Sequence, residues 1–132
     1  MKKISLLLIT FFAIQIVSAQ EQTSQLKDTI YDYKNVDVKP DFSEGVGGLY
    51  KFINKNFQKP KKEGLYGNVI STFVIETDGS ITDIKVLKDV GYGSSDEIIR
   101  VLKKSGKWVP ATLNGLAVRC HYQLPIRIDT RR

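Results

Sequence analysis

The sequence predicts an α+β domain of two layers, in which a three-stranded antiparallel sheet carries two helices on one face. Three observations lead to this fold class. A thirteen-residue run, Leu116–Ile128, alternates between apolar and polar side chains, which is the period of a long strand with one buried face. Two further apolar runs flank an Asp-Gly turn, and two other stretches have apolar residues at helical spacing.

The first two strands are expected at Val69–Glu76 and Ile81–Lys88. Between them stands Thr77–Ser80, which contains Asp78-Gly79. Asp-Gly between apolar runs is a strong hairpin signal, because both residues tolerate the backbone angles of a tight turn. The two strands are therefore predicted to be antiparallel neighbours.

A helix is expected to follow this hairpin and to begin at Ser94, because Ser94 and Glu97 have the spacing of a capping box. Its core stripe consists of Ile98, Val101 and Leu102. We expect it to end near Ser105, where Gly106 suits the left-handed position after a helix. Asn114-Gly115 then predicts the tight turn that starts the last strand.

The order of the strands follows from the handedness of the crossover. A right-handed connection from the second strand through the helix places the last strand beside the first, which gives the order 2-1-3. The last strand, Leu116–Ile128, is then expected at an edge of the sheet with a row of unpaired N–H and C=O groups. Such an edge invites the addition of another strand.

The N-terminus has the pattern of a Sec signal peptide over residues 1–19. A basic start, Met1-Lys2-Lys3, precedes the apolar stretch Ile4–Val17 and the small-residue site Val17-Ser18-Ala19. About fourteen residues at about 1.5 Å each cover roughly 21 Å, less than a hydrocarbon core of about 30 Å. We therefore expect cleavage before Gln20 and export to the periplasm, with an uncleaved inner-membrane anchor as the alternative.

The rest of the chain is expected to form a polar lead over residues 20–39 and one domain over residues 40–132. Loss of Lys2 and Lys3 lowers the formal charge from +6 to +4. This small excess is unlike that of a nucleic-acid-binding protein and suits a partner with acidic residues.

The residue types that carry catalysis are scarce. Cys120 and His121 are the only cysteine and histidine, and neighbouring residues of a strand point to opposite faces. A thiol nucleophile with its base is therefore not expected, and neither is a zinc site. The sequence predicts no enzyme, no cofactor and no metal ion, and it predicts that Cys120 is a buried apolar residue.

Two other features have a structural and a functional interpretation. Trp108 either closes the end of the core between the second helix and the last strand or anchors an interface. Lys55, Lys59, Lys61 and Lys62 form a basic cluster near the end of a first helix. The cluster either complements the helix dipole in solvent or contacts a lipid or a partner.

The order of these signals resembles the C-terminal domain of TonB energy transducers, over roughly Pro40–Ile128. The matching residues are Gly67, Val69, Phe73, Ile75, Asp78-Gly79, Ile81, Asp96-Glu97, Ile99-Arg100, Lys107-Trp108, Pro110, Asn114-Gly115, Val118, Tyr122 and Leu124-Pro125-Ile126. Upstream, the helical spacing of Leu49, Phe52, Ile53 and Phe57, followed by Pro60, matches the first helix of that family.

Three departures from the family pattern stand out. Gly106 occupies a position where many relatives have proline, and the link from Pro60 to Gly67 is short. The third is the N-terminus, because a full transducer has an uncleaved membrane helix and a long proline-rich spacer, whereas residues 20–39 contain no proline. The chain therefore looks like a stand-alone C-terminal domain, for which active energy transduction is not expected.

The resemblance implies binding of a short extended segment of a TonB-dependent outer-membrane receptor by β-augmentation. The expected site is the last strand, with a backbone ladder formed by Val118, Arg119, Cys120, His121, Tyr122, Gln123 and Leu124. Side chains of Arg119, His121 and Gln123 are expected to read the bound segment from the outer face, with Arg119 paired to an acidic residue. Self-association through the same strand, as a structural protein of the envelope, is the competing hypothesis, and a small secreted enzyme is a third.

Overall fold

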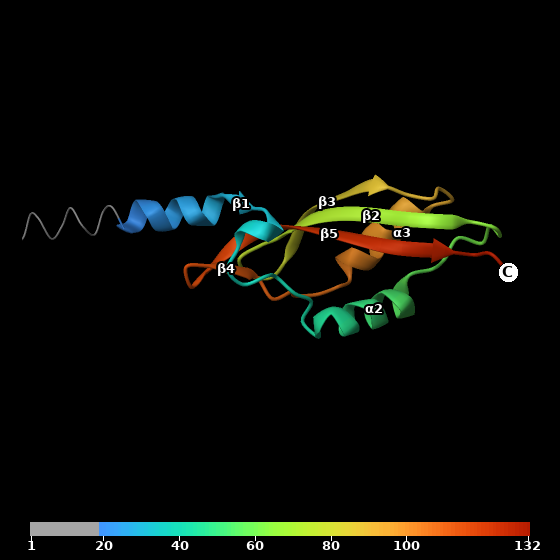
Figure 1. Cartoon of the computed structure of the whole chain (residues 1–132), viewed down its shortest axis with the longest axis horizontal. Helices are drawn as coiled ribbons and strands as arrows, with labels where there is room; N and C mark the ends of the chain where they lie inside the picture. Colours follow the sequence, from blue (N-terminus) through green and yellow to red (C-terminus); the bar gives the residue numbers. More distant parts are fainter. Residues whose placement is uncertain (1–18) are drawn as a thin grey trace, which may run out of the picture.

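A computed structural model describes residues 19–132 (Figure 1). The signal peptide expected at residues 1–19 lies, except for its last residue, outside the described residues. Residues 19–28 are helical. The elements that follow are β1 (Ile30–Tyr31), the 3-10 helix η1 (Tyr33–Asn35), α2 (Gly45–Asn56), β2 (Tyr66–Ile75), β3 (Ile81–Lys88), α3 (Ser94–Lys103), β4 (Ala111–Leu113) and β5 (Leu116–Asp129). Within residues 19–132, no helix has the length and apolar content needed to cross a membrane.

The sheet is built around two long antiparallel strands, β2 and β5, which pair without interruption from Tyr66 opposite Asp129 to Ile75 opposite Cys120. β3 pairs antiparallel with β2, on the side of β2 that faces away from β5. At the other edge of β5, the short β1 pairs in parallel with Arg119 and Cys120. β4 pairs antiparallel with the first residues of β5, beyond the end of β2.

The three-stranded antiparallel sheet expected from the sequence is therefore incomplete in two respects. The sheet has five strands, and the pairing of β1 with β5 is parallel, so that the sheet is mixed. Residues 30–41 also belong to the sheet region, because Val38 bridges to Thr112 and Asp41 bridges to Val109. This part of the expected polar lead is thus attached to the domain by backbone hydrogen bonds.

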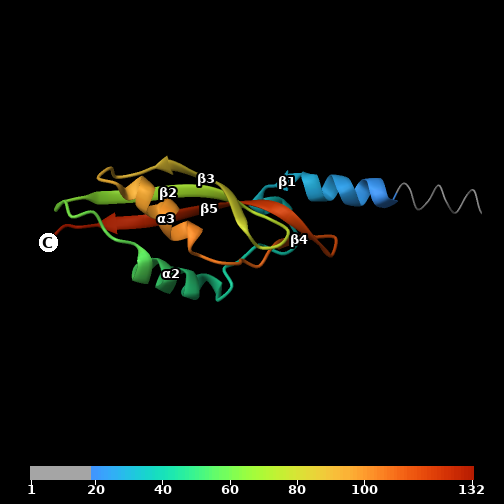
Figure 2. The same ribbon diagram turned by 180° about the vertical axis from the view of Figure 1, so that it is seen from behind.

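The main core lies between the sheet and the two helices, which pack on one face (Figure 2). Alternate residues of β2 and β5 supply Val69, Phe73, Ile75, Leu124, Ile126 and Ile128, while Leu49 and Ile53 of α2 and Ile98 and Leu102 of α3 cover them. The alternation predicted for the last strand is confirmed, since its even residues from Val118 on turn inward. A smaller cluster of Val36, Ala111, Val118 and Cys120 lies under the β1 end.

The start of α3 differs from the expected capping box. Gly93, with φ of 82°, is the N-cap, and no side chain caps the helix. Ser94 is buried as the first helical residue, and its hydroxyl accepts a hydrogen bond from the Val90 N–H (3.3 Å). Because Gly93 is the N-cap, the Glu97 side chain does not cap α3 and can contact residues outside this helix.

Glu97 instead links the two helices. Its carboxylate accepts a hydrogen bond from the Gln58 N–H (2.9 Å) just after α2, and it pairs with Arg100. Arg100 donates to the Asn56 carbonyl (2.8 Å), which satisfies a carbonyl at the C-terminal end of α2. The arginine beside it lowers the pKa of Glu97 below its usual value.

Trp108 closes the core, which confirms the structural interpretation of this residue. It is buried, and its ring meets Phe42, Phe73 and Tyr122 at centroid distances of 5.2–5.3 Å. Its indole N–H donates to the Ser105 hydroxyl (3.0 Å), and its backbone N–H donates to the Gly79 carbonyl (2.7 Å). The β2–β3 turn is thereby held against the segment that leads into β4.

Candidate functional site

One edge of β5 is only partly covered. β1 and β2 both pair with Cys120, so they lie on opposite sides of β5. β1 has only two residues, and the chain then leaves the edge through η1. Within residues 19–132, no strand pairs with Tyr122–Asp129 on the side away from β2.

The hydrogen bonds at both ends of β2 show which residues of β5 direct their backbone groups to this edge. In an antiparallel pair, opposed residues alternate between those that exchange backbone hydrogen bonds and those that do not. The Glu76 N–H donates to the Ser80 carbonyl (2.8 Å), so the even residues of β2 near this end face β3 and the odd ones face β5.

The other end of the pair agrees, because the Thr130 N–H donates to the Leu65 carbonyl (2.9 Å). Even residues of β5, such as Tyr122 and Leu124, therefore bond to β2. Gln123 and Arg127 direct their N–H and C=O groups to the uncovered edge. Pro125 stands at an outward position too, where its missing N–H costs the β2 ladder nothing.

The opposite edge of the sheet, β3, is less suited to accept a strand. Its register against β2 shifts twice, and Asp83 has a left-handed backbone with φ of 51° at one of these shifts. Asp83 and Lys85 form an exposed ion pair there (3.4 Å). Bulges and charges of this kind are the usual protection of an edge strand against unwanted pairing.

The residues of the expected site fall into two groups. Val118 pairs with Ala111 of β4, and Arg119 and Cys120 pair with β1. His121, Tyr122, Gln123 and Leu124 have β2 as their strand partner among the described residues. The uncovered stretch thus begins later than expected and extends further, to Asp129.

Arg119 is already engaged within the chain. Its guanidinium makes two hydrogen bonds to the Glu76 carboxylate (2.7 and 3.1 Å) and one to the Asp28 carbonyl (3.2 Å). Both side chains are less than one third exposed. The guanidinium lowers the pKa of Glu76, and the carboxylate raises the pKa of Arg119. Arg119 therefore fixes the segment before β1 to β5.

A cavity of about 480 Å³ opens where β1 ends and the uncovered edge begins. It is lined by Asp32, Tyr33, Lys34, Thr72, His121, Tyr122 and Gln123. The ring of Tyr33 meets that of Tyr122 edge-on at 5.9 Å, and burial raises the pKa of Tyr122. The two phenol rings together line one side of the cavity at this end of the edge.

Cys120 and His121 do not form a catalytic pair. Cys120 is buried, and burial raises the pKa of its thiol to about 11, so the reactive thiolate is scarce at neutral pH. The side chain of His121 is exposed on the opposite face. Residues 19–132 contain no group of three or more His, Cys, Asp or Glu side chains arranged to hold a metal ion.

The family described as Gram-negative bacterial TonB protein C-terminal matches residues 58–129, from just after α2 to the end of β5. The chain belongs to the TonB C-terminal family. Members of this family are periplasmic interaction domains of TonB-dependent transport and do not belong to a known enzyme family. No curated protein and no solved structure matches the chain.

The matched range includes β2, β3, α3, β4 and β5 but leaves out β1, η1 and α2. The segment that covers Arg119 and Cys120 therefore lies outside the region by which this TonB C-terminal domain is recognised. Sequence reasoning missed this cover, since β1 has only two residues and no alternating pattern. Its one usable signal was the pair of apolar residues Ile30-Tyr31 in a polar lead.

Proposed function

We propose that this TonB C-terminal domain binds a short extended segment of a TonB-dependent outer-membrane receptor along the uncovered edge of β5. The observation that carries the proposal is the regular stretch Tyr122–Asp129, whose side away from β2 has no strand partner within residues 19–132 and carries the outward backbone groups of Gln123 and Arg127. An added strand gains backbone hydrogen bonds from such an edge, and neighbouring side chains supply selectivity. The cavity beside Tyr33 and His121 is available to one side chain of the bound segment.

The periplasm is the compartment in which we place this binding. The signal-peptide pattern of residues 1–19 supports export, and the membership in a periplasmic family agrees with it. An anchored form would instead keep residues 1–19 and hold the domain near the inner membrane. The mass of the protein purified from the periplasm tests this: we expect a chain that starts at Gln20, and a chain that retains residues 1–19 contradicts cleavage.

The variant Gln123→Pro tests the edge directly. Proline removes one outward N–H, and it does not break the β2 ladder because Gln123 does not bond to β2. We expect its affinity for a peptide from the receptor's N-terminal plug segment to fall at least tenfold, the equivalent of about 1.4 kcal/mol. Gln123→Ala keeps the N–H and serves as the matched control, with affinity within about threefold of the natural protein.

Folding is checked in the same samples by the amide NMR spectrum, which should change only near position 123. Equal peptide binding by a folded Gln123→Pro variant would exclude the edge of β5 as the site. Self-association is the competing outcome: peptide-independent shifts on Tyr122–Arg127 that grow with protein concentration would point to a second copy as the partner.

A further inference from the structure

The excess positive charge of the chain is concentrated at one end of the molecule. Two segments, 55–63 and 127–132, contain four lysines and three arginines against one glutamate and one aspartate, a net charge of +5. The rest of residues 19–132 has a net charge of −1. We call this end, formed by the two segments, the basic end.

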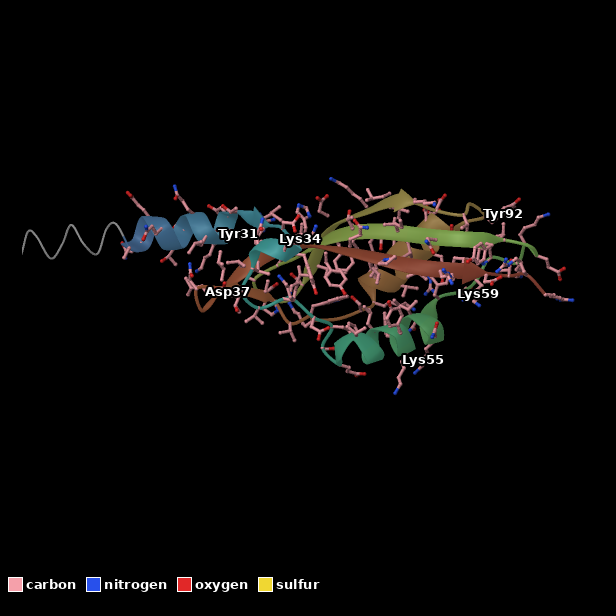
Figure 3. The ribbon with its side chains drawn as sticks, viewed as in Figure 1. Tyr31, Lys34, Asp37, Lys55, Lys59 and Tyr92 are labelled. Atoms are coloured by element: carbon pink, nitrogen blue, oxygen red, sulfur yellow. The ribbon has the colours of Figure 1, made fainter. Side chains whose placement is uncertain are left out.

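The two segments are joined in space. The Lys62 carbonyl accepts a hydrogen bond from the Thr130 hydroxyl (2.7 Å), and Arg132 pairs with Glu63 (2.9 Å). Figure 3 shows Lys55 and Lys59 at the end of the molecule where the chain terminates, whereas Tyr31, Lys34 and Asp37 lie toward the helix of residues 19–28. The basic end thus faces away from that helix along the long axis (Figure 1).

The helix dipole does not account for the basic end. Lys55 is the only basic residue in the last turn of α2. Lys59, Lys61 and Lys62 lie beyond the helix and are exposed, and none of them forms an ion pair within residues 19–132. The solvated helix-end interpretation of the sequence therefore applies to one of the four lysines.

Two exposed tyrosines accompany these cations. Tyr66 is 51% exposed, and the guanidinium groups of Arg127 and Arg131 both lie over its ring, at 5.5 and 3.8 Å. Tyr92 is 65% exposed at the same end of the molecule (Figure 3). It stands between Gly91 and Gly93, and all three residues have a left-handed backbone, with φ of 55–82°. This loop directs Tyr92 outward.

We propose that the basic end docks onto an anionic lipid surface. Lysines and arginines near such a surface each contribute attraction to the headgroups, and tyrosines and arginines are the residues that settle at the level of the headgroups. Most of these cations lie in the loop after α2 and in the residues after β5, and such a set of exposed charges fits a charged plane better than a shaped protein pocket. The charge of the basic end supplies the complementarity, and the inference is independent of peptide binding by β5.

Vesicle binding by the mature protein tests this proposal. We expect it to sediment with vesicles of phosphatidylglycerol but not with vesicles of phosphatidylcholine, and to be released as the salt concentration rises. The variant K59E/K61E/K62E should lose more than a hundredfold in binding, because each lysine near an anionic surface contributes roughly a fivefold effect and reversal removes more.

A control variant distinguishes the effect of where the lysines lie from the effect of the net charge of the protein. K34E/K103E/K104E changes the charge by the same amount on η1 and at the end of α3, and we expect at least a tenfold smaller loss than for the first variant. Tyr92→Ser should weaken binding severalfold without changing its salt dependence. Equal loss in both triple variants, or no binding to phosphatidylglycerol at low salt, overturns the proposal. The proposal is also overturned if K59E/K61E/K62E loses affinity for a detergent-solubilised receptor but still binds the vesicles.

Discussion

At the scale of single residues, two separate constraints require glycine at position 79. Its φ is 84°, and a Cβ at this position would lie 2.1 Å from the carbonyl oxygen of Trp108. The backbone angle alone disfavours any other residue, and the close carbonyl adds a clash with the main chain, which has little freedom to move. The turn and the core therefore depend on each other at this point.

Gly79→Ala is expected to destabilise the protein by about 3 kcal/mol, the sum of a left-handed alanine and an overpacked contact. The matched control is Gly91→Ala, since Gly91 has a similar φ of 73° but nothing within 4 Å of the added Cβ. The control should cost about 1–2 kcal/mol. Urea unfolding measures both variants, and equal losses would mean that the contact with Trp108 is unimportant.

Glu76 gives a pH dependence with a defined sign. The Arg119 guanidinium lowers the pKa of Glu76 in the folded protein below its usual value. The pair therefore stabilises the fold above the unfolded pKa, and this contribution is lost as the pH falls through the folded pKa. Glu76→Gln should reduce the free energy of unfolding by about 1 kcal/mol at pH 7. As the pH falls from 5 to 3, the variant should lose less stability than the natural protein does. Parallel pH curves for the two proteins would contradict this assignment.

These residue-level contacts mark the limit of what the sequence predicts. Asp78-Gly79 was correctly predicted as a turn, because the signal is local. The approach of Trp108 to Gly79 and the pairing of Glu76 with Arg119 join residues 29 and 43 positions apart, and no local pattern encodes them. The Ser94 capping box failed for a related reason, since Glu97 has a competing partner in the Gln58 N–H.

At the scale of elements, the connection of α2 to α3 depends on Glu97. Glu97→Ala leaves the Gln58 N–H and the Arg100 guanidinium without their carboxylate, and we expect a loss of about 1 kcal/mol. Hydrogen exchange at Gln58 should become faster. Asp96→Ala removes a neighbouring carboxylate from the same helical turn but no hydrogen bond among the described contacts, and it should leave that exchange rate unchanged.

The long elements were predictable, and the short ones were not. β5 alternates between buried and exposed residues over most of its length, β2 and β3 are apolar runs on either side of an Asp-Gly turn, and α2 and α3 have clear core stripes. β1 and β4 have two and three residues, so they carry no period. Their positions depend on the tertiary contacts of Arg119 and of the Asn114-Gly115 turn. Because β1 was missed, the expected binding strand began too early.

At the scale of the whole molecule, the two surfaces proposed for binding differ in their physical character. Over Tyr122–Asp129, β5 has no strand partner within residues 19–132 on its side away from β2, whereas the basic end has exposed charge. The shifts of register in β3 make that edge less suited to accept a strand, which favours β5 as the edge for the proposed strand addition. Adding a strand at β5 would enlarge a sheet that already contains the two longest strands of the fold, β2 and β5.

Amide hydrogen exchange with and without receptor peptide is the measurement that tests the central claim most directly. The alternation of β5 makes a residue-by-residue prediction: the amides of Gln123 and Arg127 gain protection when peptide is added, whereas those of Tyr122, Leu124 and Ile126 are already protected by β2. Protection gained at Gln123 and Arg127, with no change at Tyr122, Leu124 and Ile126, would establish strand addition at this edge. Unchanged exchange at Gln123 and Arg127, with new protection on β3 or nowhere, would contradict it.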